Sequence, residues 1–136
     1  MTTPHFDGKA DANAFFKDLK VPTTYLNTTY FMSNFIYFGA GPKKGEDGTY
    51  VFYTNMKDAK MPIIDTEDLA LACVKIFNDS SYIGKSVYFT SDVISWDYIA
   101  ATFSEVFGIK CKTIHIDDEA MRHAGYPGAE EFSNMF

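Results

Sequence analysis

The chain has 136 residues, of which 46% are hydrophobic and 17% aromatic, so it can bury the core of one domain spanning residues 1–136. Twelve basic residues against eighteen acidic ones give a net charge of −6. Nucleic acids and anionic membranes both require a basic surface, so this charge argues against either as a direct partner.

The start of the chain shows no pattern of secretion or membrane insertion. Residues 2–12 are polar where a signal peptide would have an apolar stretch, and no apolar run approaches a membrane-spanning length. Cys73 and Cys111 belong to no Cys-x-x-Cys pair, and each is expected to be a buried small side chain. The expected location is therefore the cytoplasm, with the nucleus as a further option.

The first elements predicted along the chain are a helix and a strand. A helix near residues 7–20, with Asp7 as its cap, carries an apolar stripe at helical spacing. The stripe consists of Ala12, Phe15, Phe16 and Leu19. Pro22 ends this helix, and residues 23–26 have the composition of a buried strand, which the stripe is expected to cover. Residues 31–38 carry no clean period and are compatible with helix or strand.

Strands and helices continue to alternate in the rest of the chain. The predicted strands are 49–53, 61–64, 85–90 and 112–116. The predicted helices begin at Asp65 or Thr66, at Ser95, at Asp117 and at Pro127, and Gly108 ends the one that begins at Ser95. The stripes of the two longer ones are Leu69, Cys73, Ile76 and Phe77, and Ile99, Phe103, Val106 and Phe107. The alternation predicts the α/β class, with strand 85–90 or residues 63–64 beside strand 23–26.

Two patterns that imitate nucleotide-binding motifs are set aside. Gly39-Ala40-Gly41 lacks the third Gly and the preceding buried strand of a dinucleotide fingerprint. Tyr53 and Lys57 have the Tyr-x-x-x-Lys spacing of short-chain dehydrogenases, but this spacing works on a helix and here follows a predicted strand. The three histidines have no metal-ligand spacing, so no metal site is predicted.

His5 and Lys9 are a more informative pair, because they lie four residues apart where a helix is predicted to start. A Lys on that helix, directed toward the end of the next strand, is able to hydrogen-bond a ribose or polarise a carbonyl. The alternative, which the spacing alone favours, is a solvated Lys and a surface His.

A series of segments, in order along essentially the whole chain, carries a family resemblance. They are His5–Lys9, Val21–Thr24, Tyr30–Phe35, Asp65–Leu69, Tyr82–Lys85, Gly125–Ala129 and Asn134–Phe136. Together they resemble the NmrA-like family of atypical short-chain dehydrogenases. The resemblance implies a Rossmann domain that binds NADP(H), with a smaller C-terminal subdomain closing over the nicotinamide end.

The same resemblance implies roles for particular residues. It implies cofactor contacts from Lys9 and from Phe31, Met32, Ser33 and Asn34. The conventional catalytic Tyr is replaced, with His5 at its spacing, so Lys9 and His5 are the candidate catalytic residues. Many members of the family are consequently NADP(H) sensors or regulators.

The resemblance covers the C-terminal part of the family's fold, and the Gly-rich βαβ units that hold the pyrophosphate have no counterpart in this sequence. The expected fold is therefore α/β, a partial Rossmann-type sheet beside the C-terminal substrate or regulatory subdomain. The leading functional hypothesis is a non-catalytic, NADP(H)-linked redox sensor or regulator that acts through a protein partner or self-association. The alternatives are an NADPH-dependent reductase, in which Lys9 orients the cofactor and His5 donates a proton, and an inactive remnant without nucleotide binding.

Overall fold

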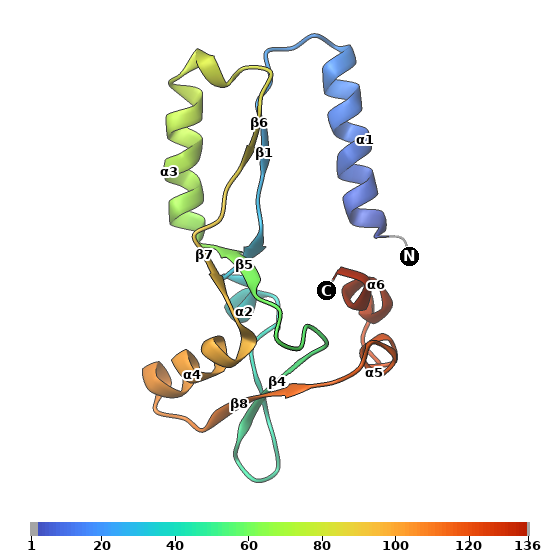
Figure 1. Cartoon of the computed structure of the whole chain (residues 1–136), viewed down its shortest axis with the longest axis vertical. Helices are drawn as coiled ribbons and strands as arrows, with labels where there is room; N and C mark the ends of the chain where they lie inside the picture. Colours follow the sequence, from blue (N-terminus) through green and yellow to red (C-terminus); the bar gives the residue numbers. More distant parts are fainter. Residues whose placement is uncertain (1–2, 136) are drawn as a thin grey trace.

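Helices and short strands alternate along the chain, which confirms the α/β class predicted from the sequence (Figure 1). The computed structural model describes residues 3–135. The helices are α1 (Pro4–Asp18), α2 (Asn34–Tyr37), α3 (Thr66–Phe77), α4 (Trp96–Phe107), α5 (Asp118–Arg122) and α6 (Ala129–Met135), with a 3₁₀ turn at Ser80–Tyr82. The strands are β1 (Tyr25–Asn27), β2 (Tyr30–Phe31), β3 (Lys43–Lys44), β4 (Tyr50–Thr54), β5 (Met61–Ile64), β6 (Ser86–Tyr88), β7 (Asp92–Ile94) and β8 (Cys111–His115).

The described strands form three small sheets instead of one continuous sheet. β1 pairs with β6 in parallel, so the predicted neighbour of the first strand is confirmed. β5 pairs in parallel with β2 and antiparallel with β7. β4 lies between β3, which is antiparallel, and β8, which is parallel over five residue pairs from Tyr50 opposite Cys111 to Thr54 opposite His115.

Side-chain caps begin the helices where the sequence predicts them. The Asp65 carboxylate accepts the Glu67 N–H at 2.7 Å at the start of α3, and Ser95 Oγ accepts the Tyr98 N–H at 3.2 Å at the start of α4. Asp117 caps α5 in the same way. Gly108 ends α4 with a φ of 62°, in the left-handed region that favours glycine.

The buried core lies between β4, β5 and the first half of α4. Its members are Phe52, Met61, Ile63, Trp96, Ile99 and Ala100. The stripe predicted for α4 is therefore only partly correct, because Ile99 is buried and Phe103 packs against the core, while Val106 and Phe107 are exposed. The strands β4 and β5 contact the beginning of α4. Trp96 and Ala100 are therefore buried there, whereas the helical period predicted burial of Val106 and Phe107 near its end.

The first helix departs most from its predicted environment. It begins at Pro4 instead of being capped by Asp7, since Pro lacks the N–H that would be unpaired at that position. Its predicted stripe is not buried: Phe15 is 61% exposed and Leu19 is 51% exposed. The expected packing of this stripe on strand 23–26 is therefore wrong, because a two-stranded sheet offers little apolar face to a helix. The Lys17 ammonium instead lies 5.4 Å from the centroid of the Tyr25 ring.

Smaller corrections concern the third and the last helices. Phe77, assigned to the stripe of α3, is 88% exposed, and Leu69 in the same stripe is half-buried. Cys73 and Cys111 are only partly buried, whereas full burial was expected. This partial burial raises the pKa of the Cys111 thiol. The predicted last helix begins at Ala129 instead of Pro127, and the predicted end at residue 136 lies outside the described residues.

Residues 31–38, which the sequence left open between helix and strand, contain the end of a strand, a turn and a short helix. The segment passes from the end of β2 through a turn into the short helix α2. Within residues 3–135, no helix is long and apolar enough to cross a membrane.

Candidate functional site

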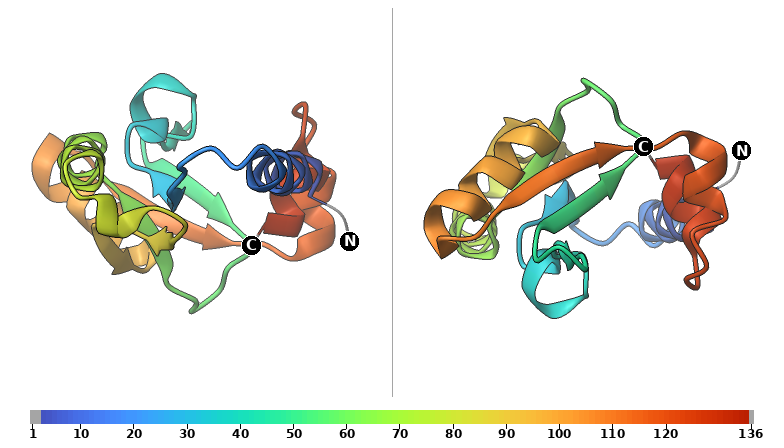
Figure 2. Two further views of the ribbon diagram at one scale, coloured as in Figure 1. Left: turned by 90° about the horizontal axis from the view of Figure 1, so that it is seen from above. Right: turned by 90° about the horizontal axis from the view of Figure 1, so that it is seen from below.

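An apolar cleft of about 830 Å³ lies between β4, the start of α4 and the C-terminal helices. Most of its lining side chains are aromatic or aliphatic. The aromatic ones include Tyr30, Phe52, Trp96, Tyr126 and Phe132. Figures 1 and 2 show α5 and α6 side by side beyond the end of β8, and Met121 and Phe132 of these helices line the cleft. A cleft of this size and character is typical of sites for small molecules.

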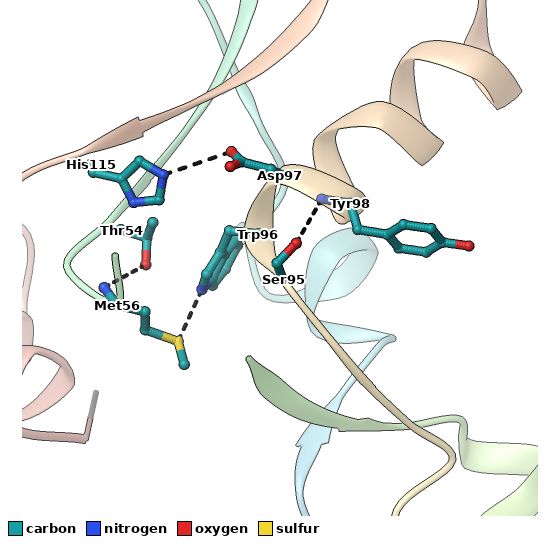
Figure 3. Close-up of polar contacts among 7 residues, drawn as sticks. All are labelled: Thr54, Met56, Ser95, Trp96, Asp97, Tyr98 and His115. Carbon is teal, nitrogen blue, oxygen red and sulfur yellow. Dashed lines mark hydrogen bonds and ion pairs between the residues drawn. The ribbon is translucent and has the colours of Figure 1, made fainter. Parts of the chain in front are cut away.

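The position of the cleft follows from the parallel pairing of β4 and β8. Thr54 and His115 are the paired last residues of these strands, so both strands end at one edge, which is where α/β proteins place ligands. Figure 3 shows the start of α4 at the same edge, with His115 Nε2 3.7 Å from a carboxylate oxygen of Asp97. The Trp96 indole N–H donates to the Met56 sulfur at 3.0 Å, which fixes the plane of the ring beside the cleft.

Asn55 attaches the C-terminal helices to the end of β4. Its buried side-chain amide donates to Asp118 Oδ1 at 3.0 Å and to the Ser133 carbonyl oxygen at 3.2 Å. The Ser133 hydroxyl in turn donates to the Asp118 carbonyl oxygen at 3.1 Å. The two consecutive helices α5 and α6 are therefore held to the end of β4, which lies 63 residues or more before them in the sequence. They keep the Phe132 and Tyr126 side of the cleft in place.

Two tyrosines supply hydroxyl groups at the cleft. Burial raises the pKa of Tyr30 to about 12, against a smaller opposite effect from its hydrogen bond with the Asn34 side chain. Burial also raises the pKa of Tyr126, whose hydroxyl donates to the Met121 sulfur at 3.6 Å. Both phenols are therefore neutral hydrogen-bond donors at physiological pH.

The segment predicted to contact a cofactor, Phe31–Asn34, is a half-buried turn at the carboxyl end of β2. The Met32 N–H donates to the Ile64 carbonyl oxygen at 3.0 Å, and its side chain packs against the core. The Ser33 carbonyl oxygen accepts the N–H groups of the last two residues of α2, and the Asn34 side chain is hydrogen-bonded to Tyr30. None of these four residues lines the cleft, but their neighbour Tyr30 does. Their contact with a cofactor stays a prediction.

His5 and Lys9 both lie on α1, and the structure gives them different surroundings. The His5 N–H donates to Glu131 Oε1 at 3.0 Å, and the His5 ring is hydrogen-bonded to the same oxygen. The backbone bond from His5, followed by the ring contact, lowers the pKa of the Glu131 carboxyl. Lys9 is exposed, with its ammonium 5.9 Å from the centroid of the Phe6 ring.

Sequence reasoning missed several of the residues that matter here. Glu131 lies 126 residues from His5, and no spacing rule connects them. No pattern in the sequence marked Trp96 or Phe132 as cleft residues. Tyr30 and Tyr126, in contrast, belong to the segments that carried the family resemblance. Those two tyrosines were the available signal for the cleft.

The two motifs that were set aside lack the local structure that each nucleotide-binding motif requires. Tyr53 lies on β4, and Lys57 lies in a turn with a φ of 51°, so the pair shares no helix face. Gly39, Ala40 and Gly41 follow α2 and line the cleft, with no strand before them. In the described part of the chain, no three His, Cys, Asp or Glu side chains gather as metal ligands would.

The Tyr30 phenol is expected to ionise later than an exposed tyrosine, near its pKa of about 12. The folded chain retains this proton, whereas the unfolded chain releases it near pH 10. The contribution of Tyr30 to the free energy of unfolding is therefore fully present below pH 10 and is lost as the pH rises toward 12. A spectrophotometric titration of Tyr30→Phe should lack the latest phenol transition of the parent chain. Loss of an early transition instead would contradict the burial of Tyr30.

The sequence of this chain matches the NmrA-like family over residues 1–136. Among solved structures it is similar to NmrA, a negative transcriptional regulator in complex with NAD, with 20% identity and a TM-score of 0.62 over 76% of this chain and 34% of that one. It is also similar to the Citrobacter sp. triphenylmethane reductase complexed with NADP(H), with 22% identity and a TM-score of 0.63 over 88% of this chain and 42% of that one.

An NADPH-dependent quinone oxidoreductase from Escherichia coli shows 19% identity and a TM-score of 0.71 over 95% of this chain and 48% of that one. At these identities the likeness shows a shared fold, with parallel strands as in Rossmann proteins of this type. The chain spans about a third to a half of the length of these solved relatives, namely 34%, 42% and 48%. By its sequence match over residues 1–136, the chain belongs to the NmrA-like family.

Proposed function

We propose that the chain is part of a non-catalytic, NADP(H)-linked regulatory protein, with the nicotinamide end of the cofactor beside the Phe31–Asn34 turn. Support comes from the solved relatives, which include a transcriptional regulator in complex with NAD or NADP and a reductase complexed with NADP(H). The turn itself lies at the carboxyl end of a parallel strand, next to an apolar cleft. This is the side on which Rossmann-type sheets bind their ligands.

The observation that carries the non-catalytic reading is the bond between His5 and Glu131. By the family resemblance, His5 stands where dehydrogenases hold their proton-donating Tyr. In this structure its ring and its backbone N–H both engage one carboxylate of α6, so the residue joins two helices. A proton donor must lie within hydrogen-bond reach of the reacting atom, and His5 is not among the residues that line the cleft. His5 therefore serves as a link between α1 and the cleft-lining helix α6.

The residues proposed to meet the cofactor supply little binding free energy. One charged hydrogen bond from Lys9 contributes about 1.5–3 kcal/mol. Micromolar binding requires about 8 kcal/mol. The printed sequence has no Gly-rich turn at a helix N-terminus, which is the element that holds a pyrophosphate in Rossmann proteins. Contacts between a half-buried turn and a nicotinamide ring are too weak to supply the remaining binding free energy.

We therefore expect the 136-residue chain to bind NADPH with a dissociation constant of about 1 mM or weaker. Calorimetric titration measures the affinity, and amide chemical shifts locate the contact. Shifts should change at Lys9 and at Phe31–Asn34 and stay constant around Lys57, which is a matched lysine in a turn. Lys9→Ala should remove the changes at the turn, while Lys57→Ala leaves them.

Micromolar binding would contradict this expectation and favour the second candidate, an NADPH-dependent reductase. The aromatic cleft beside the turn is the observation in its favour, since it offers space for an acceptor. In that case NADPH should be consumed with a quinone acceptor, and Lys9→Ala should abolish turnover without unfolding the chain. Absence of any shift at saturating NADPH would instead support the third reading, a chain without nucleotide binding.

A further inference from the structure

The outer edge of β1 presents backbone groups that face no partner strand. The Tyr25 N–H donates to the Lys85 carbonyl oxygen at 2.9 Å. The Asn27 carbonyl oxygen accepts the Phe89 N–H at 3.0 Å. Tyr25 and Asn27 therefore face β6, and the N–H and C=O of Leu26 between them face the opposite side. Among the described strands only β6 pairs with β1, so these two groups of Leu26 are open to another chain.

An apolar groove of about 520 Å³ follows the same strand on the side of α3. Its lining includes Leu26 of β1 and Phe77 of α3, together with Ile83 before β6. None of the described residues of β6 lines the groove, which therefore opens beside β1. Phe77 and Ile83 are both exposed. The unpaired edge is thus bordered by apolar surface that a partner would remove from water.

A second copy of the chain is the partner that matches this edge. Of the printed sequence, only residues 1–2 and 136 lie outside the described range, and these are too few to pair along β1. A strand edge pairs with its own copy across a two-fold axis, because the two strands then run antiparallel and present the same residues. With Leu26 on this axis, its N–H and C=O bond to the C=O and N–H of Leu26 in the second copy.

The helices that flank the β1–β6 pair add apolar area to such an interface. Lys17 of α1 contacts Tyr25, whereas the next residue, Leu26, lies in the groove of α3, so the helices cover opposite faces (Figure 1). A two-fold axis perpendicular to the sheet places both α1 helices on one face and both α3 helices on the other. A standard interface buries about 800 Å² on each partner. A buried aromatic side chain supplies about 150–250 Å², so the exposed Phe16 and Phe77 provide a substantial part of this area.

We infer that the chain forms a symmetric dimer in which β1 pairs antiparallel with β1 of a second copy, with Leu26 on the two-fold axis. The joined sheet then has the strand order β6-β1-β1-β6. This inference goes beyond the proposed function, because the pairing requires no nucleotide and is tested without one.

Leu26→Pro removes the outward N–H in both copies and keeps the bonds of Tyr25 and Asn27 to β6, since an edge strand tolerates proline. The dissociation constant of the dimer, measured by sedimentation, should rise at least about tenfold with the loss of two hydrogen bonds. Tyr88→Pro is the matched control, because the Tyr88 N–H faces outward on the other edge, that of β6. It should change the dissociation constant by less than about twofold. Circular dichroism verifies the fold of both variants.

Amide hydrogen exchange tests the register in the unsubstituted chain, and it decides the matter if Leu26→Pro does not fold. The Leu26 N–H should be protected at concentrations where the dimer forms and should lose this protection on dilution. The Tyr88 N–H should exchange rapidly at all concentrations. A chain that stays monomeric, a dimer that tolerates Leu26→Pro, or a Leu26 N–H whose exchange does not depend on concentration would each overturn the inference.

Discussion

Replacing Phe52 with Ala is expected to lower the free energy of unfolding by about 3–5 kcal/mol. Phe52 is 3% exposed on β4, and its ring centroid lies 5.6 Å from that of Trp96 and 5.2 Å from that of Phe103. Truncation removes these contacts and leaves a cavity that the surrounding strands and α4 cannot fill. Because a whole domain is stable by only about 5–15 kcal/mol, urea unfolding should show a large fall in the midpoint.

Phe107→Ala is the matched control, since it truncates the same side chain at a position that is 63% exposed on α4. Its effect should be below about 1 kcal/mol. Equal losses in the two variants would show that the core around β4, β5 and α4 is not the part of the molecule that unfolds cooperatively.

The purified chain is expected to self-associate. α1 and α3 stand on either side of the β1–β6 pair and leave large apolar side chains exposed (Figure 1). Phe16 is 45% exposed, and Phe77 is 88% exposed. Among the described strands, β1 and β6 pair only with each other, so their outer edges have unpaired backbone groups. Such edges and faces favour pairing with another chain, and light scattering should detect dimers or larger species.

The double substitution Phe16→Lys with Phe77→Lys should shift the chain toward the monomer, because it places a charge on each apolar face. Asn13→Lys is the control on α1, since it adds a charge at an exposed polar position. Sedimentation at several concentrations compares the three chains. A monomeric parent chain at all concentrations would mean that these faces do not associate.

The sequence predicted the features that depend on neighbours along the chain. Asp65, Ser95 and Asp117 cap their helices because a side-chain oxygen two or three residues ahead accepts an N–H that the helix leaves unpaired. Gly108 ends α4 because glycine tolerates a positive φ. The turn at residues 31–34 was not predicted, because residues 31–38 carry no clean period and were compatible with helix or strand.

Contacts between distant segments were decided by the tertiary structure alone. The helical period marks Phe15 and Leu19 as one apolar stripe, yet burial depends on whether an apolar surface lies opposite, and the narrow β1–β6 pair provides little. The bond from His5 to Glu131 spans 126 residues, and the cleft collects Tyr30 and Tyr126 from opposite ends of the chain. Spacing along a sequence determines which residues share a face, whereas the path of the backbone in space determines what that face meets.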